Sequence, residues 1–261
     1  MARKQFWIGT SWKMNMVRAE ARLFAQTLKA SPVLSQPHFQ PFIVPPFPSI
    51  AEVAECLSDT QVIVGAQNMH WADHGPWTGE VSPLMIKDCG ATLVELGHSE
   101  RREHFGETDE TVALKTAAAL SHGLIPLICI GDSWEEYQAG RTADVLSRQV
   151  HIALSKLTDQ NSARILFAYE PVWSIGERGV PADPDFANEH HGRIKHVISQ
   201  ITGTALPVLY GGSVNRSNCV SFAKAPHIDG LFIGRSAWTV EGFIDIINAV
   251  TTALAPKELE A

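Results

Sequence analysis

The chain has 261 residues, of which 45% are hydrophobic, and 28 acidic residues against 21 Lys and Arg give it a formal net charge of −7. This length suits a single domain over residues 1–261. The acidic balance argues against a nucleic-acid-binding surface, and the longest apolar runs are too short to cross a membrane, so we expect neither partner.

Short apolar segments typical of buried strands recur along the chain. They alternate with helical stretches, of which 18–28 and 109–120 are the clearest, and Ser82-Pro83 and Asp183-Pro184 are typical helix starts. This alternation predicts an α/β fold with a closed, parallel eightfold β/α barrel, and a doubly wound open sheet is the alternative. The predicted strands are 6–9, 41–44, 62–65, 92–96, 124–130, 165–169, 208–210 and 231–233.

Cysteine and histidine usage indicates no metal site. The cysteines lie far apart without metal-ligand spacing, and the first six residues lack the apolar segment of a secretory signal, so we expect reduced thiols in a cytoplasmic protein. His70, His74, His190 and His191 form no evident ligand cluster, and we expect them at the surface. Residues 256–261 are expected to be a disordered tail. The cysteines are Cys56, Cys89, Cys129 and Cys219.

The most informative segment is 168–176, with the sequence Ala-Tyr-Glu-Pro-Val-Trp-Ser-Ile-Gly. The preceding apolar run delivers Glu170 at a strand end, and Pro171 stops the strand by removing a hydrogen-bond donor. A carboxylate at a rigid strand end suits a general base under a mobile lid, residues 171–182. A solvated loop carboxylate is the alternative from this segment alone.

Multi-residue motifs follow five of the predicted strands, and in this order they resemble triosephosphate isomerase over essentially the whole chain. The resemblance implies a β/α barrel that isomerises a phosphorylated sugar and needs no cofactor. No Gly-x-Gly-x-x-Gly follows the first strand, which weakens a dinucleotide-binding version of the open-sheet alternative. Besides the segment of Glu170, the motifs are Trp12-Lys13-Met14-Asn15, Gly97-His98-Ser99-Glu100-Arg101-Arg102, Tyr210-Gly211-Gly212-Ser213-Val214-Asn215 and Asp229-Gly230-Leu231-Phe232-Ile233-Gly234.

The resemblance implies a role for each polar residue in these motifs. Glu170 is the base that moves a proton between neighbouring carbons, and His98 is a neutral electrophile. A short helix starting at Ser99 would disfavour the imidazolium through its dipole. Lys13 steadies the enediolate oxygen and helps hold the phosphate. Glu100 pairs with Lys13, although a charge capping the helix N-terminus is an equal alternative.

The resemblance also implies a phosphate site. Main-chain N–H groups at Gly176, Ser213 and Gly234 can approach an anion closely, since glycine lacks a Cβ atom. Loops after the seventh and eighth strands of a barrel often bind phosphate, which favours this interpretation over ordinary turn glycines.

Residues 68–80 form a long loop that contains Met69, His70, Trp71 and Trp77. Exposed aromatic residues gathered in one loop indicate an interface. In the resembling family this loop contacts a second subunit, so we expect a homodimer. The alternative is a loop folded onto its own barrel.

Three positions depart from the family pattern: Ser11 replaces an asparagine, Arg235 replaces a glycine, and the tip of the lid differs over 176–182. These departures resemble a bacterial branch of the family that converts L-erythrulose 1-phosphate into D-erythrulose 4-phosphate during erythritol catabolism. That substrate is dihydroxyacetone phosphate with one added hydroxymethyl group. Ser11 would leave room for the group and Arg235 would offer donors. The alternatives are the glycolytic triose substrate and, more remotely, a non-catalytic barrel that binds a phosphosugar.

Overall fold

Parallel strands close into a barrel in the computed structural model of the protein, which describes residues 5–157, 164–176 and 179–255. Each strand pairs with its neighbours in chain order, and β8 returns to pair with β1. The barrel fold is therefore confirmed, and the open-sheet alternative is wrong. The strands are β1 (Phe6–Ser11), β2 (Phe39–Val44), β3 (Ile63–Ala66), β4 (Leu93–Leu96), β5 (Ile125–Ile130), β6 (Leu166–Tyr169), β7 (Val208–Tyr210) and β8 (Gly230–Ile233).

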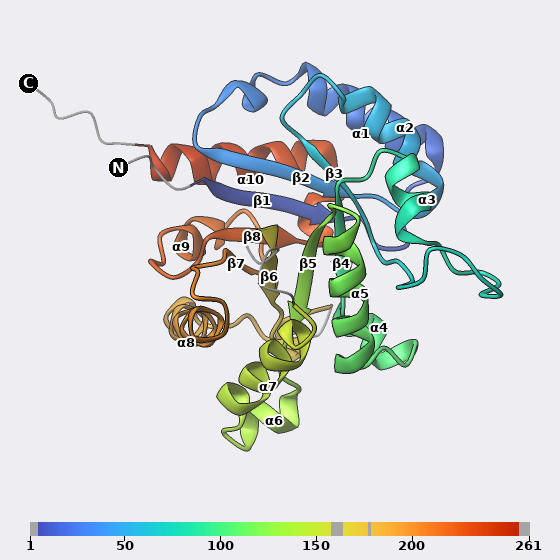
Figure 1. Cartoon of the computed structure of the whole chain (residues 1–261). Helices are drawn as coiled ribbons and strands as arrows, with labels where there is room; N and C mark the ends of the chain where they lie inside the picture. Colours follow the sequence, from blue (N-terminus) through green and yellow to red (C-terminus); the bar gives the residue numbers. More distant parts are fainter. Residues whose placement is uncertain (1–4, 158–163, 177–178, 256–261) are drawn as a thin grey trace, which may run out of the picture.

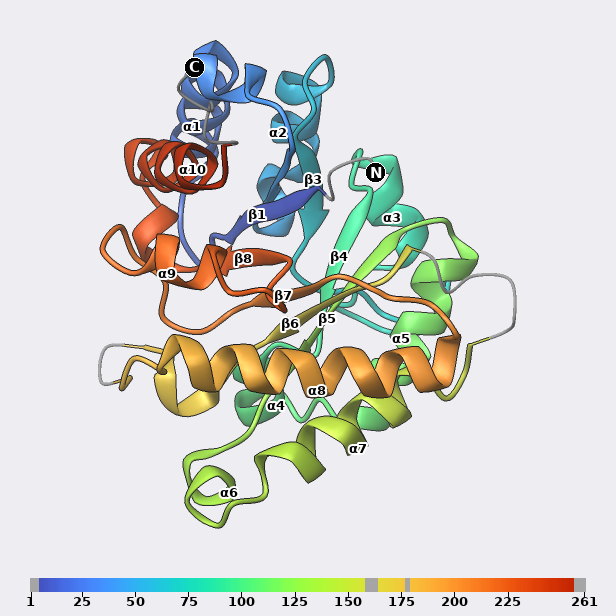
Figure 2. The same cartoon turned by 90° about the vertical axis from the view of Figure 1, so that its left-hand side faces the viewer.

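Helices surround the barrel, with α1, α2 and α10 near β1–β3 in Figure 1 and the long α8 lying across the side of the sheet in Figure 2. No helix within the described ranges is both long and apolar enough to span a bilayer. The α-helices are α1 (Arg18–Ala30), α2 (Ile50–Leu57), α3 (Pro83–Asp88), α4 (Ser99–His104), α5 (Asp109–Ser121), α6 (Trp134–Gln138), α7 (Thr142–Leu154), α8 (Pro184–Thr202), α9 (Cys219–Ala223) and α10 (Val240–Leu254).

The two predicted helix starts have the expected capping geometry. The Ser82 side chain accepts a hydrogen bond from the N–H of Met85, and Asp183 accepts from the N–H groups of Asp185 and Phe186. Each cap satisfies main-chain donors that have no partner within the helix, and the proline at the first helical position lacks such a donor. The local sequence thus sets where α3 and α8 begin, and with them the lengths of the preceding loops.

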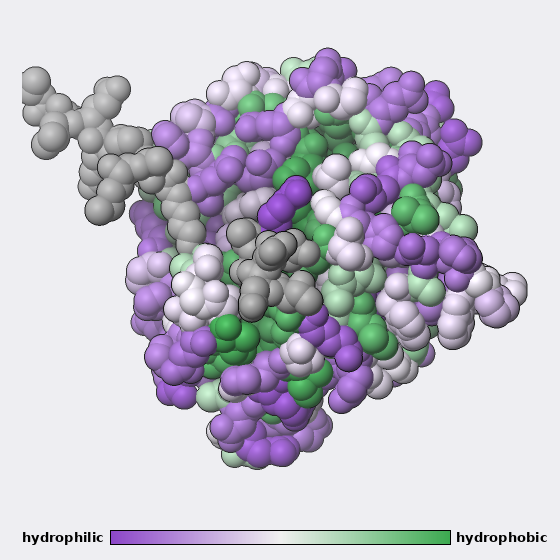
Figure 3. Space-filling model, viewed as in Figure 1, coloured by the Kyte–Doolittle hydropathy of each residue, from purple (hydrophilic) through white to green (hydrophobic). Residues whose placement is uncertain are grey.

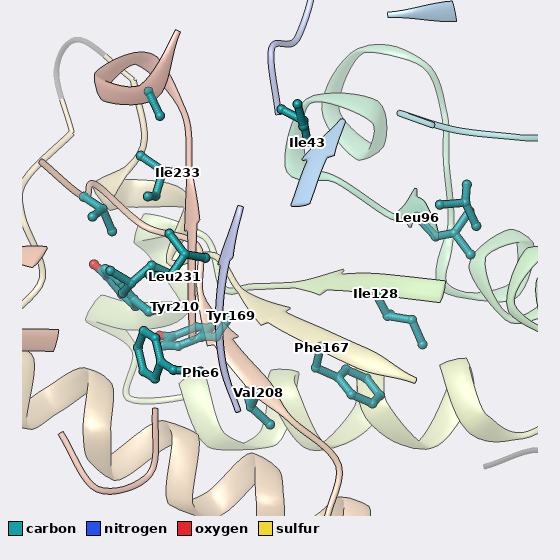
Figure 4. Close-up of a cluster of buried hydrophobic side chains, with 14 of the residues drawn as sticks. Phe6, Ile43, Leu96, Ile128, Phe167, Tyr169, Val208, Tyr210, Leu231 and Ile233 are labelled. Carbon is teal, nitrogen blue, oxygen red and sulfur yellow. The ribbon is translucent and has the colours of Figure 1, made fainter. Parts of the chain in front are cut away.

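Alternation along the strands divides the core into two layers. Outward side chains such as Ile43, Ile128 and Phe167 pack in the layer that Figure 4 shows. Inward side chains fill the barrel, where Phe42 stacks on Phe232 with ring centroids 5.6 Å apart. Gly9 makes room for Phe42, because a Cβ atom there would lie 2.2 Å from the ring. Because this alternation continues along each strand, inward-facing positions also occur at the carboxyl end of the barrel.

Candidate active site

Three polar residues occupy inward positions at this end of the barrel. Ser11 ends β1, Glu95 lies on β4, and Glu170 follows β6, each in step with the buried inward residues of its strand. All three side chains are buried. The closed sheet therefore brings together groups that are far apart in the sequence.

Glu170 is held from several sides. Its N–H donates to the carbonyl of Ile130 at 2.7 Å, and its Oε2 accepts from the N–H of Ser99 at 3.3 Å. Two glycines pack against it: a Cβ atom at Gly131 would lie 1.9 Å from the Glu170 carbonyl oxygen, and one at Gly211 would lie 2.9 Å from its Cγ. This packing fixes the carboxylate and leaves Oε1 facing His98.

His98 stands at the N-cap of α4, which begins at Ser99 as predicted. Its Nδ1 accepts a hydrogen bond from the N–H of Glu100 at 3.1 Å. A neutral imidazole with Nδ1 as acceptor carries its proton on Nε2. Nε2 lies 3.5 Å from Oε1 of Glu170, the candidate general base. The tautomer assigned from the Glu100 hydrogen bond therefore directs the Nε2–H group toward Glu170.

Lys13 follows β1 with a left-handed backbone, φ 52°, which is costly for a residue other than glycine. Gln67 supports this conformation, since its Nε2 donates to the Lys13 carbonyl at 2.9 Å. The Lys13 Nζ atom lies 2.6 Å from Oε1 of Glu100. Burial raises the pKa of Glu100, but the contact with Lys13 outweighs it and the pKa lies below its usual value. The expected pairing is therefore present, and Glu100 is also in the first turn of α4.

The predicted site residues line one cavity of about 280 Å³. A Cβ atom at Gly234 would meet no described residue within 4 Å other than its chain neighbours, and the exposed Arg235 follows it on the same loop. Each residue that the sequence pointed to is therefore at a single site. They are Ser11, Lys13, His98, Glu100, Glu170, Gly176, Ser213, Gly234 and Arg235.

The predicted lid is described over 171–176 and 179–182, and Glu177 and Arg178 of its tip lie outside the described residues. Its first part is a short 3-10 helix, Val172–Ser174. Ser174 Oγ accepts from the N–H of Ser213 at 3.4 Å, which joins the lid to the loop after β7. Trp173 donates its indole N–H to the buried Asp132 at 3.3 Å. These contacts anchor the lid at the end where it leaves β6.

Glu95 is the residue that the sequence analysis missed. It is 2% exposed, and its Oε2 accepts a hydrogen bond from Ser11 Oγ at 2.9 Å. Burial raises its pKa to about 7, and repulsion from Glu170 acts in the same direction. His98, Ser11 and Lys13 oppose the shift. The available signal was a glutamate inside the apolar segment 92–96, because a carboxyl buried in a strand is rare without a partner or a role.

Glu95, His98 and Glu170 offer ligand atoms that all lie within 4.8 Å of one another, the kind of group that could hold a metal ion. The sequence analysis did not anticipate this cluster. The expectation that the other histidines lie at the surface is wrong for His70, which is 5% exposed, and for His190 and His191 on α8, which are 7% exposed and fully buried. Both lie on the face of α8 that packs against the barrel, and burial lowers the pKa of His191 to about 4.

The loop of residues 68–80 is partly buried at its base and projects at the right of Figure 1. Met69 and His70 are buried, whereas Trp77 is 47% exposed, so the expectation of a wholly exposed aromatic set is wrong. His70 stacks on Trp71 with ring centroids 4.1 Å apart and lies 4.4 Å from Trp77. The loop thus has its own aromatic core.

A buried side chain also holds the start of the loop. The buried Lys115, which pairs with Glu107, donates a hydrogen bond to Asn68 at the start of the loop. Figure 3 shows its outer part as a projection of intermediate hydropathy.

Comparisons with known proteins agree with this geometry. The sequence profile of the family described as triosephosphate isomerase matches residues 6–250. A Rhizobium rhizogenes protein named L-erythrulose-1-phosphate isomerase is 60% identical over 247 residues, 94% of this chain and 95% of the relative. Proteins of the same name from Brucella abortus biovar 1 and Mesorhizobium japonicum are 60% and 54% identical, and the matches cover 95% of this chain and 97% and 98% of theirs. The chain belongs to the triosephosphate isomerase family.

Proposed function

We infer that this protein isomerises L-erythrulose 1-phosphate to D-erythrulose 4-phosphate through an enediolate intermediate. The observation that carries the choice of substrate is the 60% identity, over 94% of the chain, to a relative with that printed name. The reaction type is supported by the 3.5 Å approach of the Glu170 carboxylate to Nε2 of His98 in one cavity. Glycolytic conversion of dihydroxyacetone phosphate is the alternative, since the family profile carries that enzyme's description.

In the proposed reaction Glu170 removes the proton from carbon 3, and the C2 carbonyl oxygen takes up the electron pair. The Nε2–H group of His98 donates to this oxygen and relays the hydroxyl proton between O3 and O2. Glu170 then returns the proton to carbon 2, which leaves the carbonyl at carbon 3. Atoms and charge balance without a cofactor, because one proton moves between carbons and one between oxygens.

Lys13 and the glycine-rich loops complete the proposed mechanism. The Lys13 ammonium group, held 2.6 Å from Glu100, is placed to stabilise the negative oxygen of the enediolate. Main-chain N–H groups near Gly176, Ser213 and Gly234 are proposed to bind the phosphate, and the open space at Gly234 leaves room for it. Closure of the lid would keep water from the intermediate.

The test is a rate assay on purified protein with both substrates. We expect a higher kcat/KM for L-erythrulose 1-phosphate than for dihydroxyacetone phosphate. A higher value for the triose would favour glycolytic isomerisation. Binding of both phosphosugars without turnover of either would favour a non-catalytic barrel.

We also propose that the protein acts as a homodimer in the cytoplasm. Met14 is 96% exposed and Phe105 is 67% exposed, and both line a second cavity of about 200 Å³ beside Lys13. Such an apolar rim is suited to burial by the projecting loop of a second copy. Trp77→Asp should then raise the monomer fraction in sedimentation and lower activity. A monomeric wild type at micromolar concentration would contradict the proposal.

A further inference from the structure

Glu95 is a buried carboxyl that the proposed reaction does not use. It lies on β4, whereas the glycine-rich loops proposed to bind phosphate follow β7 and β8. In the closed order of the sheet, β4 stands opposite β8. A phosphorylated ligand that starts at the glycine-rich loops and crosses the barrel mouth therefore ends near Glu95.

One oxygen of Glu95 is engaged and the other faces the site. Oε2 accepts the hydrogen bond from Ser11, while Oε1 lies 3.9 Å from Nε2 of His98, which is beyond hydrogen-bond distance. A Glu95 oxygen also lies within 4.8 Å of the Glu170 carboxylate. An atom bonded to a carbon held between Glu170 and His98 is thus within reach of the Glu95 carboxyl.

The substrate of the proposed function, on which this inference rests, has one group at that place. Its reacting carbons lie between Glu170 and His98, and the hydroxymethyl group of carbon 4 extends away from the phosphate. We propose that Glu95, oriented by Ser11, forms a hydrogen bond with the C4 hydroxyl and thereby sets the preference for the four-carbon substrate. Ser11 acts in this scheme as a positioning residue.

The surroundings of Glu95 provide space for the added group. Glu95, Ser11, Lys13 and His98 line the inner end of the second cavity, of about 200 Å³, which adjoins the catalytic cavity through the residues that both share. The apolar rim of this second cavity, proposed above to contact a second subunit, lies at the other end. A hydroxymethyl group needs only the inner end.

A different role for Glu95 would have a different signature. If the carboxyl served only to hold His98 or to transfer its proton, its loss would slow every substrate that reacts between Glu170 and His98. A hydrogen bond to the C4 hydroxyl instead affects only substrates that carry this hydroxyl. Two substrates that differ only in this hydroxyl therefore distinguish the two roles.

The experiment compares kcat/KM for L-erythrulose 1-phosphate and for its 4-deoxy analogue, which has a methyl group in place of the hydroxymethyl. In the wild type we expect the analogue to be poorer by roughly tenfold to a hundredfold, the effect of one hydrogen bond to a charged group. Equal values for the two substrates would overturn the proposal without any variant.

Glu95→Leu should remove most of this discrimination, because kcat/KM falls far more for the natural substrate than for the analogue. Leucine is close in size and suits an apolar strand, and Glu95→Gln should recover part of the discrimination through its amide. Ser11→Ala should have an intermediate effect. Thr10→Val is the matched control, since the buried Thr10 hydroxyl, on the same strand as Ser11, has no hydrogen-bond partner among the described residues.

Failure of the inference differs from failure of the proposed function. Equal losses for both substrates in Glu95→Leu would overturn the inference and make Glu95 a positioning residue for His98. A wild type that turns over only dihydroxyacetone phosphate would instead overturn the proposed function. If thermal unfolding shows that Glu95→Leu does not fold, the inference is still tested by comparing the two substrates in the wild type and in Ser11→Ala.

Discussion

At the end of the cavity formed by the loops after β7 and β8, the glycines Gly211, Gly212 and Gly234 contribute only main-chain atoms to the lining, whereas the end near β1 and β4, where the second cavity adjoins it, is lined by the side chains of Ser11 and Glu95. The first end can recognise any phosphate, because main-chain N–H groups offer the same donors whatever the rest of the ligand is. The second end depends on side-chain identity.

This difference indicates how one barrel can serve several phosphosugars. Glu170 and His98 lie between the two ends, so in the proposed reaction they would meet the same two carbons in each substrate. Substitutions at the side-chain end can then change the preferred substrate while proton transfer and phosphate binding remain. In this proposal, main-chain groups at one end bind the phosphate and side chains at the other end set the substrate preference.

The largest expected effect comes from substituting Glu170, which lies between the two ends of the cavity. Glu170→Gln removes the general base and should lower kcat by roughly 100- to 10,000-fold for every substrate. Glu170→Asp retracts the carboxylate by about 1 Å and should cost about a hundredfold. Steady-state kinetics with both substrates checks this, and near-wild-type turnover in either variant would remove Glu170 from its assigned role.

A change at the main-chain end should weaken all phosphorylated substrates alike. Gly234→Leu places a side chain in the open space where the phosphate is proposed to bind, and we expect KM to rise roughly tenfold to a hundredfold. The ratio of kcat/KM between the four-carbon and three-carbon substrates should stay constant. A changed ratio would mean that this end also contacts parts of the substrate other than the phosphate.

Substitutions at Ser11 and Arg235 should distinguish directly the contributions of the two ends to substrate preference. Ser11 contacts Glu95, whereas Arg235 lies on the loop of Gly234. Ser11→Asn should therefore shift the kcat/KM ratio toward dihydroxyacetone phosphate by about tenfold, the smaller effect of one charged hydrogen bond. Arg235→Gly should weaken both substrates without changing the ratio. A shift caused by Arg235→Gly alone would assign the substrate preference to Arg235, one of the two positions that the sequence indicated.

The sequence predicts the middle of the site and the main-chain end better than the side-chain end. The eight strands and the start of α4 at Ser99 follow from local apolar runs and motifs, and the contact of Lys13 with Glu100 is one that the family resemblance implied. The pairing of Ser11 with Glu95 does not, because the two residues are 84 positions apart and meet only through the closure of the barrel. The burial of His191 was missed for a similar reason, since it depends on which face of α8 meets the sheet.

The smallest expected effect is a pH dependence confined to the side-chain end. Since burial raises the pKa of Glu95 to about 7, its carboxyl changes from neutral to charged near that pH. The titratable groups that face it are His98 at the start of α4, Glu170 after β6 and Lys13 after β1.

Because kcat/KM reports ionisation of the free enzyme, the ionisation of any group that acts on both substrates alike cancels in a ratio of kcat/KM values. The ratio for L-erythrulose 1-phosphate over its 4-deoxy analogue then follows Glu95 alone. An ionised carboxylate accepts a stronger hydrogen bond than a neutral carboxyl, so the ratio should rise about threefold between about pH 6 and pH 8. Glu95→Gln should flatten this rise, and a rise that persists in this variant would assign it to another group.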